Sequence, residues 1–332
     1  MRTLPILALL LGAGAATSVL LHRDRAATAA TATPVAPAAP APATCEDADG
    51  DGYGVGCAKG PDCNDHDPAV HPGATEVCNF KDDDCNALVD DAPACPVPNV
   101  ATARVKVPAG TFAMGSTAGA HDEAPVHAVT GPAFDMDRTE VTNGRYATCV
   151  AAGKCDKPTL VSSKLRPHYY DDPKFAAYPV IFVSWSQAAS FCSFAGGRLP
   201  TEAEWERAAK GTDAPRTFPW GEAKADCSKA NFAGCAGDTD VVGRREAGAS
   251  PYGALDMAGN VWEWTADWYD ARYYHASPPT NPKGPPTGKL RVMRGGCWVS
   301  GESSLRTTCR KAELPNSWAP NVGFRCVYGG AS

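Results

Sequence analysis

Cysteine is the residue that most constrains how this chain can fold. The 332 residues hold 14 cysteines, six between residues 45 and 95 and eight between residues 96 and 332. The chain opens with Arg2 and an apolar run at residues 4–21, typical of a cleaved signal peptide or a membrane anchor. Exported proteins meet oxidising conditions, so we expect most of these cysteines to form disulfides. The predicted location is the periplasm, the cell surface or the extracellular space.

Composition divides the rest of the chain into three parts after a leader at residues 1–21. Residues 22–44 are almost entirely Ala, Thr and Pro, which cannot bury a core and instead form a linker. Residues 45–95 hold 13 acidic residues against two lysines, whereas residues 96–332 hold 23 acidic and 26 basic residues. Nothing here is basic enough to indicate nucleic-acid binding. Membrane contact is expected only through residues 1–21, if they are retained.

The acidic module, residues 45–95, has the spacing of a calcium loop. In CEDADGDGYGVGC, Asp47, Asp49 and Asp51 alternate along the chain, Gly52 supplies a turn, and the Tyr53 carbonyl takes the next ligand position. Oxygen ligands at this density favour calcium over zinc or copper. The same spacing returns in a second set, formed by Asp82, Asp84, Asn86, Leu88 and Asp90.

A disordered, solvated acidic spacer is the alternative interpretation of this module. Six cysteines that can close three bridges argue for a folded unit instead, since so small a piece needs bridges or metals to fold. The segment between the two sets offers further oxygen ligands, namely Asp62, Asn64, Asp65 and Asp67. The stretch is also similar to a Cys- and Asp-rich repeat of exported bacterial proteins, which implies metal binding. Spacing leaves the pairing open among Cys45, Cys57, Cys63, Cys78, Cys85 and Cys95.

Regular structure is sparse in the large domain, residues 96–332. Three helices are predicted: one from Thr142 to Gly153, one beginning at Ser184 or Ser186, and one from a capping box at Thr201 to Gly211. Short strands are indicated at residues 103–115, 125–137 and 291–298. Residues 211–291 show almost no periodicity but are rich in Trp and Tyr, so ions or disulfides are expected to support them. The predicted fold class is α+β.

One oxygen cage is predicted within DMAGNVWEWTADWYD. An extended backbone there turns Trp262 and Trp264 into the core and Glu263 the other way. The cage for calcium would consist of two side chains and two carbonyls, from Asp256, Glu263, Gly259 and Val261. The alternative is a buried Glu263 that pairs with Arg294 or Arg325.

Seven segments together resemble the formylglycine-generating enzyme (sulfatase-modifying factor) family. They are VPAGTFAMGS, DRTEVTNGRYATCV, PVIFVSWSQAASFCSFAGGRLPTEAEWERAAKG, FPWGE, GNVWEW, NPKGPPTGKLRVMRGG and NVGFRC, and they span about residues 104–328 in order. The resemblance implies a single irregular domain, related to C-type lectin folds, with bound calcium. It places one calcium site on Asp256, Gly259, Val261 and Glu263. A second falls on Asn231 and the Phe232 carbonyl, completed by Asp238 or Asp240.

The catalytic copper of this family does not fit the residues present. Members of the family oxidise a cysteine in a sulfatase with O2 and a copper ion that two cysteines hold, five positions apart after a GGS motif. Counted from Gly295 and Gly296, those places fall on Ser300 and Leu305; counted back from Arg310 with a gap, they fall on Cys297 and Glu302. Neither register supplies the two soft thiolates that Cu(I) prefers. Ser300 has no recognisable base nearby in sequence.

The eight cysteines of the large domain allow four disulfides. The resemblance implies a bridge between Cys192 and Cys326. Cys149 with Cys155 would close a helix exit, and Cys227 with Cys235 would bracket the loop of Asn231. This leaves Cys297 with Cys309 as a fourth bridge, in place of a catalytic thiol pair.

These observations predict an exported, calcium-binding protein whose large domain is not an oxidase. It would bind a protein, peptide or glycan in the groove that the family uses for substrate. The alternative is an active formylglycine-generating oxidase, or another oxygen-dependent metalloenzyme, with copper as its cofactor and Cys297, Cys309 or Ser300 at its site.

Overall fold

The computed structural model describes residues 45–75, 77, 83–85, 103–213 and 216–330. The predicted leader and linker lie outside these ranges, as do Cys78, Cys95 and most of the second calcium set, namely Asp82, Asn86, Leu88 and Asp90. Within the described ranges, no helix has the length and apolar character needed to cross a membrane.

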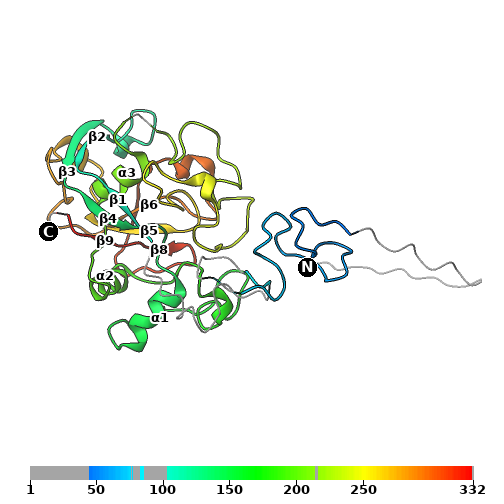
Figure 1. Ribbon diagram of the computed structural model, residues 1–332. Coiled ribbons are helices and arrows are strands. Elements are labelled where there is room, and N and C mark those ends of the chain that lie inside the picture. Colours follow the sequence, from blue (N-terminus) through cyan, green and yellow to red (C-terminus); the bar gives the residue numbers. More distant parts are fainter. Residues whose placement is uncertain (1–44, 76, 78–82, 86–102, 214–215, 331–332) are drawn as a thin grey trace, which may run out of the picture. The chain divides into compact units, whose positions relative to one another are not determined.

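Three small sheets form the framework of the large domain (Figure 1). The four-stranded sheet has the order β7-β6-β5-β8, with β5 at Trp262–Trp268, β6 at Arg291–Arg294, β7 at Lys311–Glu313 and β8 at Val322–Gly323. Strand β5 runs antiparallel to β6 and parallel to β8. A three-stranded sheet, β1-β4-β9, contains Arg104–Val107, Phe134–Asp137 and Val327–Tyr328. The hairpin of β2 (Gly110–Met114) and β3 (His127–Gly131) forms the third sheet.

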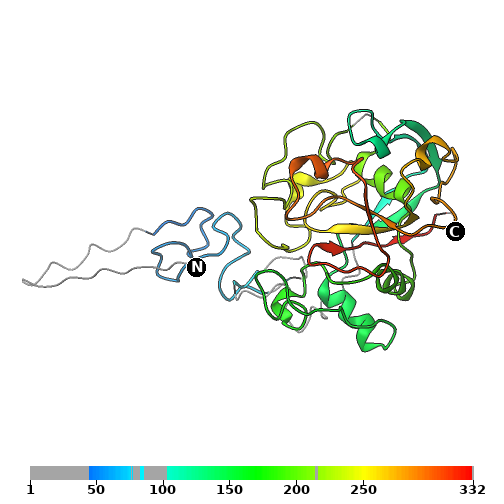
Figure 2. The same cartoon turned by 180° about the vertical axis from the view of Figure 1, so that it is seen from behind.

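The three predicted helices are confirmed, with the caps that the sequence indicates. Helix α1 spans Asn143–Ala151 after Thr142, and α2 spans Trp185–Phe194 after Ser184, which forms a capping box with Gln187. Helix α3 spans Glu202–Lys210 between the capping box of Thr201 and Gly211, whose positive φ of 78° suits a residue without a Cβ. Figure 2 shows α1 and α2 on the opposite side of the four-stranded sheet from α3.

Strand β5 is buried on both faces, and this property organises the core. Trp262 and Trp264 lie in the largest apolar cluster, together with Phe324 and the aromatic residues of α1 and α2. On its other face, Glu263 is fully buried and accepts a hydrogen bond from the Trp205 indole of α3 at 2.8 Å. The alternation of the two tryptophans is therefore as predicted, and a buried carboxylate lies between them.

The stretch predicted to be irregular, residues 211–291, contains strand β5. Its described part before β5 has little regular structure, and polar side chains hold that part in place. Asn260 donates from its side chain to Glu140 at 3.1 Å and accepts the backbone N–H of Asp240 at 2.9 Å. Gly259 has φ 88°, and a Cβ there would lie 2.3 Å from the Asn231 carbonyl oxygen, so only glycine fits. The short 3-10 turns of the domain lie at His121–Glu123, Pro173–Phe175, Glu246–Gly248, Tyr273–His275 and Glu302–Leu305.

Three of the four disulfides predicted for the large domain are confirmed: Cys149–Cys155, Cys192–Cys326 and Cys227–Cys235. The acidic module contains Cys45–Cys57 and Cys63–Cys85, two pairs that the sequence left open.

Candidate functional site

The first acidic loop curls as its spacing predicts. Asp47 accepts the backbone N–H groups of Gly50 and Gly52 at 2.7 and 2.9 Å, and Asp51 accepts that of Tyr53 at 2.8 Å. These bonds fold the loop on itself and bring its alternate carboxylates to one side. Asp49 and Asp51 have carboxylate oxygens within 4.8 Å of each other and of Asp62.

Three oxygens in this cluster have no partner. Oδ2 of Asp49, Oδ2 of Asp51 and Oδ2 of Asp62 are buried and make no hydrogen bond. Burial, followed by the charges of Asp51 and Asp62, raises the pKa of Asp49. Neighbouring carboxylates without a donor repel one another, so this arrangement favours a cation. The sequence does not show which residue of this segment joins the cluster, because Asp62 is one of four candidate ligands there.

In the first predicted cage of the large domain, an arginine pairs with Glu263. The Glu263 carboxylate receives two hydrogen bonds of 2.7 Å from Arg325, one to each oxygen. Arg325 also donates to three backbone carbonyls, at Asp137, Arg138 and Leu255. The ion pair with Arg325, which the sequence offered as the alternative, is therefore present. Calcium binding at this cage stays a prediction. Arg294 instead pairs with Glu202 and Glu206.

Asp256, the other side chain of that cage, lies beside a second buried carboxyl that the sequence did not single out. Burial raises the pKa of both Asp256 and Glu140, and the neighbouring Asp256 raises that of Glu140 further. Asp256 accepts the backbone N–H of Gly243 at 2.5 Å, and Glu140 accepts the side chain of Asn260. Two adjacent buried carboxyls with raised pKa values favour a shared proton. No spacing motif marks Glu140, which is why the sequence missed it.

Arginines pair with both acids of the second predicted calcium site, where calcium stays a prediction. The fold does bring Asn231 to Asp238, since the Asn231 side chain donates to the Asp238 carbonyl at 2.8 Å. The Asp238 carboxylate, however, pairs with Arg166 at 3.0 Å and also accepts Ser163 and the N–H of Leu165. The Asp240 carboxylate pairs with Arg244 and Arg245, at 3.0 and 2.7 Å.

Cys297 is a free, buried thiol that lies shortly after β6, which ends at Arg294. Asn321 donates to its Sγ at 3.2 Å, and Ser300 Oγ lies 3.3 Å from the same sulfur. Ser300 Oγ already accepts the backbone N–H of Cys297 at 3.0 Å, so its hydroxyl hydrogen can point to the sulfur. Asn321 therefore donates to this thiol, and Ser300 either donates to it or accepts its S–H. Asn321 immediately precedes β8, and nothing in its spacing marks it as a partner of Cys297.

The predicted bridge between Cys297 and Cys309 is wrong, because both cysteines are free. The Cys297 sulfur contacts Ser300 and Asn321, whereas Cys309 lies near the charges of Arg294, Glu123 and Arg306, and both cysteines also pack in the same apolar cluster. Burial raises the pKa of Cys309. The bridge was predicted only because the other six cysteines of the large domain had been assigned partners. Two unassigned cysteines need not lie within bonding distance of each other.

Comparison with known proteins identifies the large domain. A family model described as "Sulfatase-modifying factor enzyme 1-like domain" matches residues 91–329. The chain belongs to this family. A second model, "Putative metal-binding motif", matches residues 62–91, within the acidic module.

Relatives of this sulfatase-modifying-factor-like protein carry several different names. It is 39% identical over 241 residues to "Serine/threonine-protein kinase pkn1" of Chlamydia pneumoniae, covering 69% of this chain but only 38% of the kinase. It is 33% identical over 283 residues to "Formylglycine-generating enzyme" of Streptomyces coelicolor, covering 69% of this chain and 90% of the enzyme. The solved structure of PvdO from Pseudomonas aeruginosa aligns with a TM-score of 0.57 at 26% identity, over 68% of this chain and 93% of PvdO. The predicted fold class is thereby confirmed.

The positions where the family resemblance places copper ligands hold no pair of sulfurs in this sulfatase-modifying-factor-like domain. Leu305 is fully buried in an apolar cluster with Phe218 and Ala258. Glu302 is exposed and accepts the backbone N–H of Ala225. In one alignment the two copper positions are Ser300 and Leu305, and in the other they are Cys297 and Glu302. Cys297 is the only sulfur among these four residues, and its own contacts are Ser300 and Asn321. The residues do not fit a two-thiolate copper ion.

Exposed apolar side chains occur in the two segments that contain Cys297 and its partner Asn321. Val299 is 51% exposed, and Trp318 is 43% exposed and contacts Phe182 edge-on at a ring distance of 5.9 Å. The Asn321–Cys297 contact brings these two segments together. Leu160 is 44% exposed, and the N–H of its neighbour Thr159 donates to the Phe182 carbonyl. We call Leu160, Val299 and Trp318 the apolar patch.

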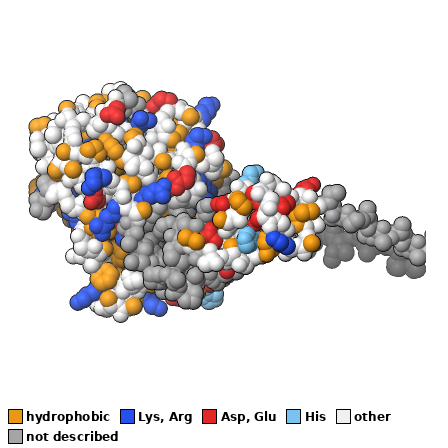
Figure 3. Space-filling view, viewed as in Figure 1, with side chains coloured by type: hydrophobic (Ala, Val, Ile, Leu, Met, Phe, Trp, Pro, Cys, Tyr) orange, Lys and Arg blue, Asp and Glu red, His pale blue; other side chains and the backbone are white. Residues whose placement is uncertain are grey.

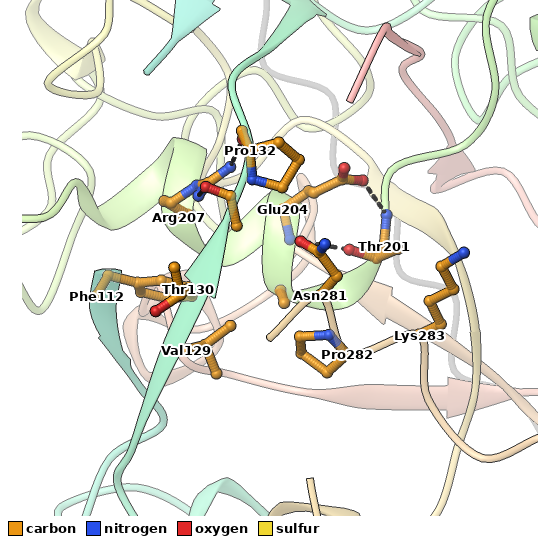
Figure 4. Close-up of a pocket in the computed structure, with 12 residues that line it drawn as sticks. Phe112, Val129, Thr130, Pro132, Thr201, Glu204, Arg207, Asn281, Pro282 and Lys283 are labelled. Carbon is orange, nitrogen blue, oxygen red and sulfur yellow. Dashed lines mark hydrogen bonds between the residues drawn. The ribbon is translucent and has the colours of Figure 1, made fainter. Parts of the chain in front are cut away.

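A small crevice lies elsewhere, between the β2–β3 hairpin, the start of α3 and residues 281–283 (Figure 4). It holds only about 20 Å³. Phe112 and Val129 form its apolar wall, and its two charged helix residues are engaged: Arg207 donates to the Pro132 carbonyl, and Glu204 accepts the N–H of Thr201. The crevice is too small for a substrate and has no uncommitted reactive group on α3.

Proposed function

We propose that this protein is an exported, non-oxidase member of the sulfatase-modifying factor family, and that its large domain binds a protein or peptide at the apolar patch. The observation that carries the proposal is that the copper positions do not hold two cysteines, and that Leu305, at one of them, is buried among apolar residues. A leucine has no lone pair to offer a metal, so no copper-bound step is available there.

The apolar patch supports a protein or peptide as the ligand. Soluble domains rarely expose a large aromatic ring beside other apolar side chains unless a partner covers them. The Trp298 indole donates to the Pro320 carbonyl at 3.2 Å, which links the segment of the exposed Val299 to that of the exposed Trp318. On the face of the large domain seen in Figure 3, acidic and basic side chains are interspersed, and neither sign forms a continuous field. A partner recognised by shape and apolar contact is therefore favoured over one recognised by charge.

Reconstitution with copper tests the loss of oxidase function. The full chain would be loaded with Cu(I), dialysed, and incubated with O2 and a peptide that carries the sulfatase cysteine motif. We expect no copper at one-to-one stoichiometry and no aldehyde in the peptide. The Streptomyces coelicolor relative serves as the positive control. Formation of aldehyde that depends on Cys297 would contradict the proposal.

The second candidate function is an oxidase that uses the two free thiols in a new way. The specific observation in its favour is that Cys297 and Cys309 are unpaired while six other cysteines of the large domain are bridged. Variants C297S and C309S separate the two proposals. If either variant abolishes an O2-dependent reaction of the wild type, the oxidase is correct; if neither protein consumes O2 with the peptide, the binding function stands.

We further propose that the acidic module binds calcium, with Asp49, Asp51 and Asp62 among the ligands. The three partnerless carboxylate oxygens support this proposal. Isothermal titration of the full chain with calcium should show a site that is lost in the D49N/D51N variant. A D135N variant is the matched control, because Asp135 is an exposed acid of the large domain, paired only with Lys106. Unchanged calcium binding in D49N/D51N would refute this assignment.

A further inference from the structure

A polar hollow of about 750 Å³ lies between the loop after β2, the end of α3 and the segment that contains Arg216 and Arg306. Its volume falls within the range of small-molecule sites. It shares no residue with the apolar patch, so the inference below does not depend on the proposed function.

Two of the cations in the wall of this hollow are already neutralised. Arg306 makes two hydrogen bonds of 2.6 Å to the buried Glu123 carboxylate. Lys210 donates to the carbonyls of Ala113 and Gly115 and pairs with Glu206. Neither side chain offers a free charge to a ligand.

Arg216 is different, because its guanidinium makes no hydrogen bond or ion pair with any residue in the described part of the chain. Its charge nevertheless reaches Glu222: hydrogen bonds from Thr217 and then the Arg216 charge lower the pKa of that carboxyl. Glu222 accepts two bonds of 2.7 Å from Thr217, one on each oxygen, and each oxygen keeps a second lone pair. An uncommitted guanidinium and an ionised carboxylate thus face the same hollow without closing on each other.

This combination selects the chemistry of the ligand. A hydroxyl group can accept a bond from Arg216 and donate one to Glu222, whereas an anion would be repelled by Glu222 and by Asp213, which also lines the hollow. Ser116 adds a further donor, since its Oγ already accepts the N–H of Ala118. No aromatic residue lines the wall, and Val126 is its largest apolar side chain. An apolar ligand would therefore gain little from burial there.

We propose that this hollow binds a neutral, polyhydroxylated ligand, a mono- or oligosaccharide, with Arg216 and Glu222 on opposite sides of one of its hydroxyl groups.

Saturation-transfer NMR on the full chain tests this proposal, with glucose, galactose and N-acetylglucosamine at millimolar concentration as probes. At least one sugar should give a signal, and its affinity should fall about tenfold in R216M and in E222Q, as loss of a charge-assisted hydrogen bond implies. R272M, at an exposed arginine outside the hollow, is the matched control and should bind like the wild type. Melting curves of all variants verify that they are folded.

Two outcomes would overturn the proposal. One is that no probe sugar gives a signal, or that the signal survives unchanged in both R216M and E222Q. The other is that inorganic phosphate, followed by phosphorus NMR, binds with a dependence on Arg216 while the sugars do not, which would make this an anion site.

Discussion

Replacing Glu263 by Gln distinguishes an ion pair from a calcium site in the core of the large domain. Both Glu263 oxygens receive bonds of 2.7 Å from Arg325, and both side chains are completely buried. E263Q removes the charge that Arg325 bonds directly and leaves its guanidinium buried, with only the more distant carboxyls of Glu140 and Asp256 nearby. Breaking one side of such a pair costs about 3–5 kcal/mol, much of it from the charge left behind. For a domain of this size each kcal/mol lowers the Tm by roughly 2–4 °C, so we expect a fall of roughly 6–20 °C.

The assay is a melting scan of wild type and E263Q, each with excess calcium and with chelator. The ion pair predicts the same fall in both conditions, because no metal takes part. D135N serves as the control: Asp135 contacts Lys106 at 2.8 Å on the surface, where such a pair contributes about 0–1 kcal/mol. The reasoning is refuted if E263Q melts like the wild type in chelator and only lacks a stabilisation that calcium gives to the wild type.

Three further predictions concern stability and thiol chemistry. Burial, followed by the charge of Glu202, raises the pKa of Asp267 to about 8. The unfolded chain loses this proton near pH 4, so the contribution of Asp267 to stability should fall as the pH rises from about 4 to about 8. Urea titrations should show the stability of D267N rising relative to that of the wild type over the same range. The paired alanine variant of the Cys192–Cys326 bridge, which closes 134 residues, should lose about 5 kcal/mol in urea unfolding, against about 2 for the Cys149–Cys155 bridge, which closes 6; equal losses would reject the loop-entropy account. Alkylation in denaturant without reductant, followed by peptide mapping, should label Cys297 and Cys309 and no other cysteine between residues 103 and 330.

Local elements of the fold were predictable from the sequence because their signals are local. Thr201 and Glu204 mark the start of α3 through a capping box, and Gly211 ends the helix with a positive φ. The spacing of Asp47, Asp49 and Asp51 predicted a curled loop, and the structure has one, with Asp49 close to Asp47 in one cluster and to Asp51 in another. In each case the interacting groups lie within a few residues of one another.

The partners of the buried carboxylates were not predictable in the same way. The sequence offered calcium or an arginine for Glu263 on nearly equal terms, and Arg325 lies 62 residues away along the chain. Asp238 and Arg166 are likewise far apart in sequence, and their pairing depends on how the irregular loops cross. Coulomb attraction can neutralise a buried acid with a metal or with a guanidinium, and spacing alone cannot distinguish them.

The sequence by itself determined the division into an acidic module and a large irregular domain, the family of that domain, its three helices, and the misfit of the copper positions. Tertiary structure alone decided that Cys297 and Cys309 are not bonded to each other, and which arginines pair with Glu263, Asp238 and Asp240. The physical reason is that a disulfide or an ion pair requires two groups to meet in space at the correct orientation. In a domain with so little regular structure, long-range packing controls which groups meet.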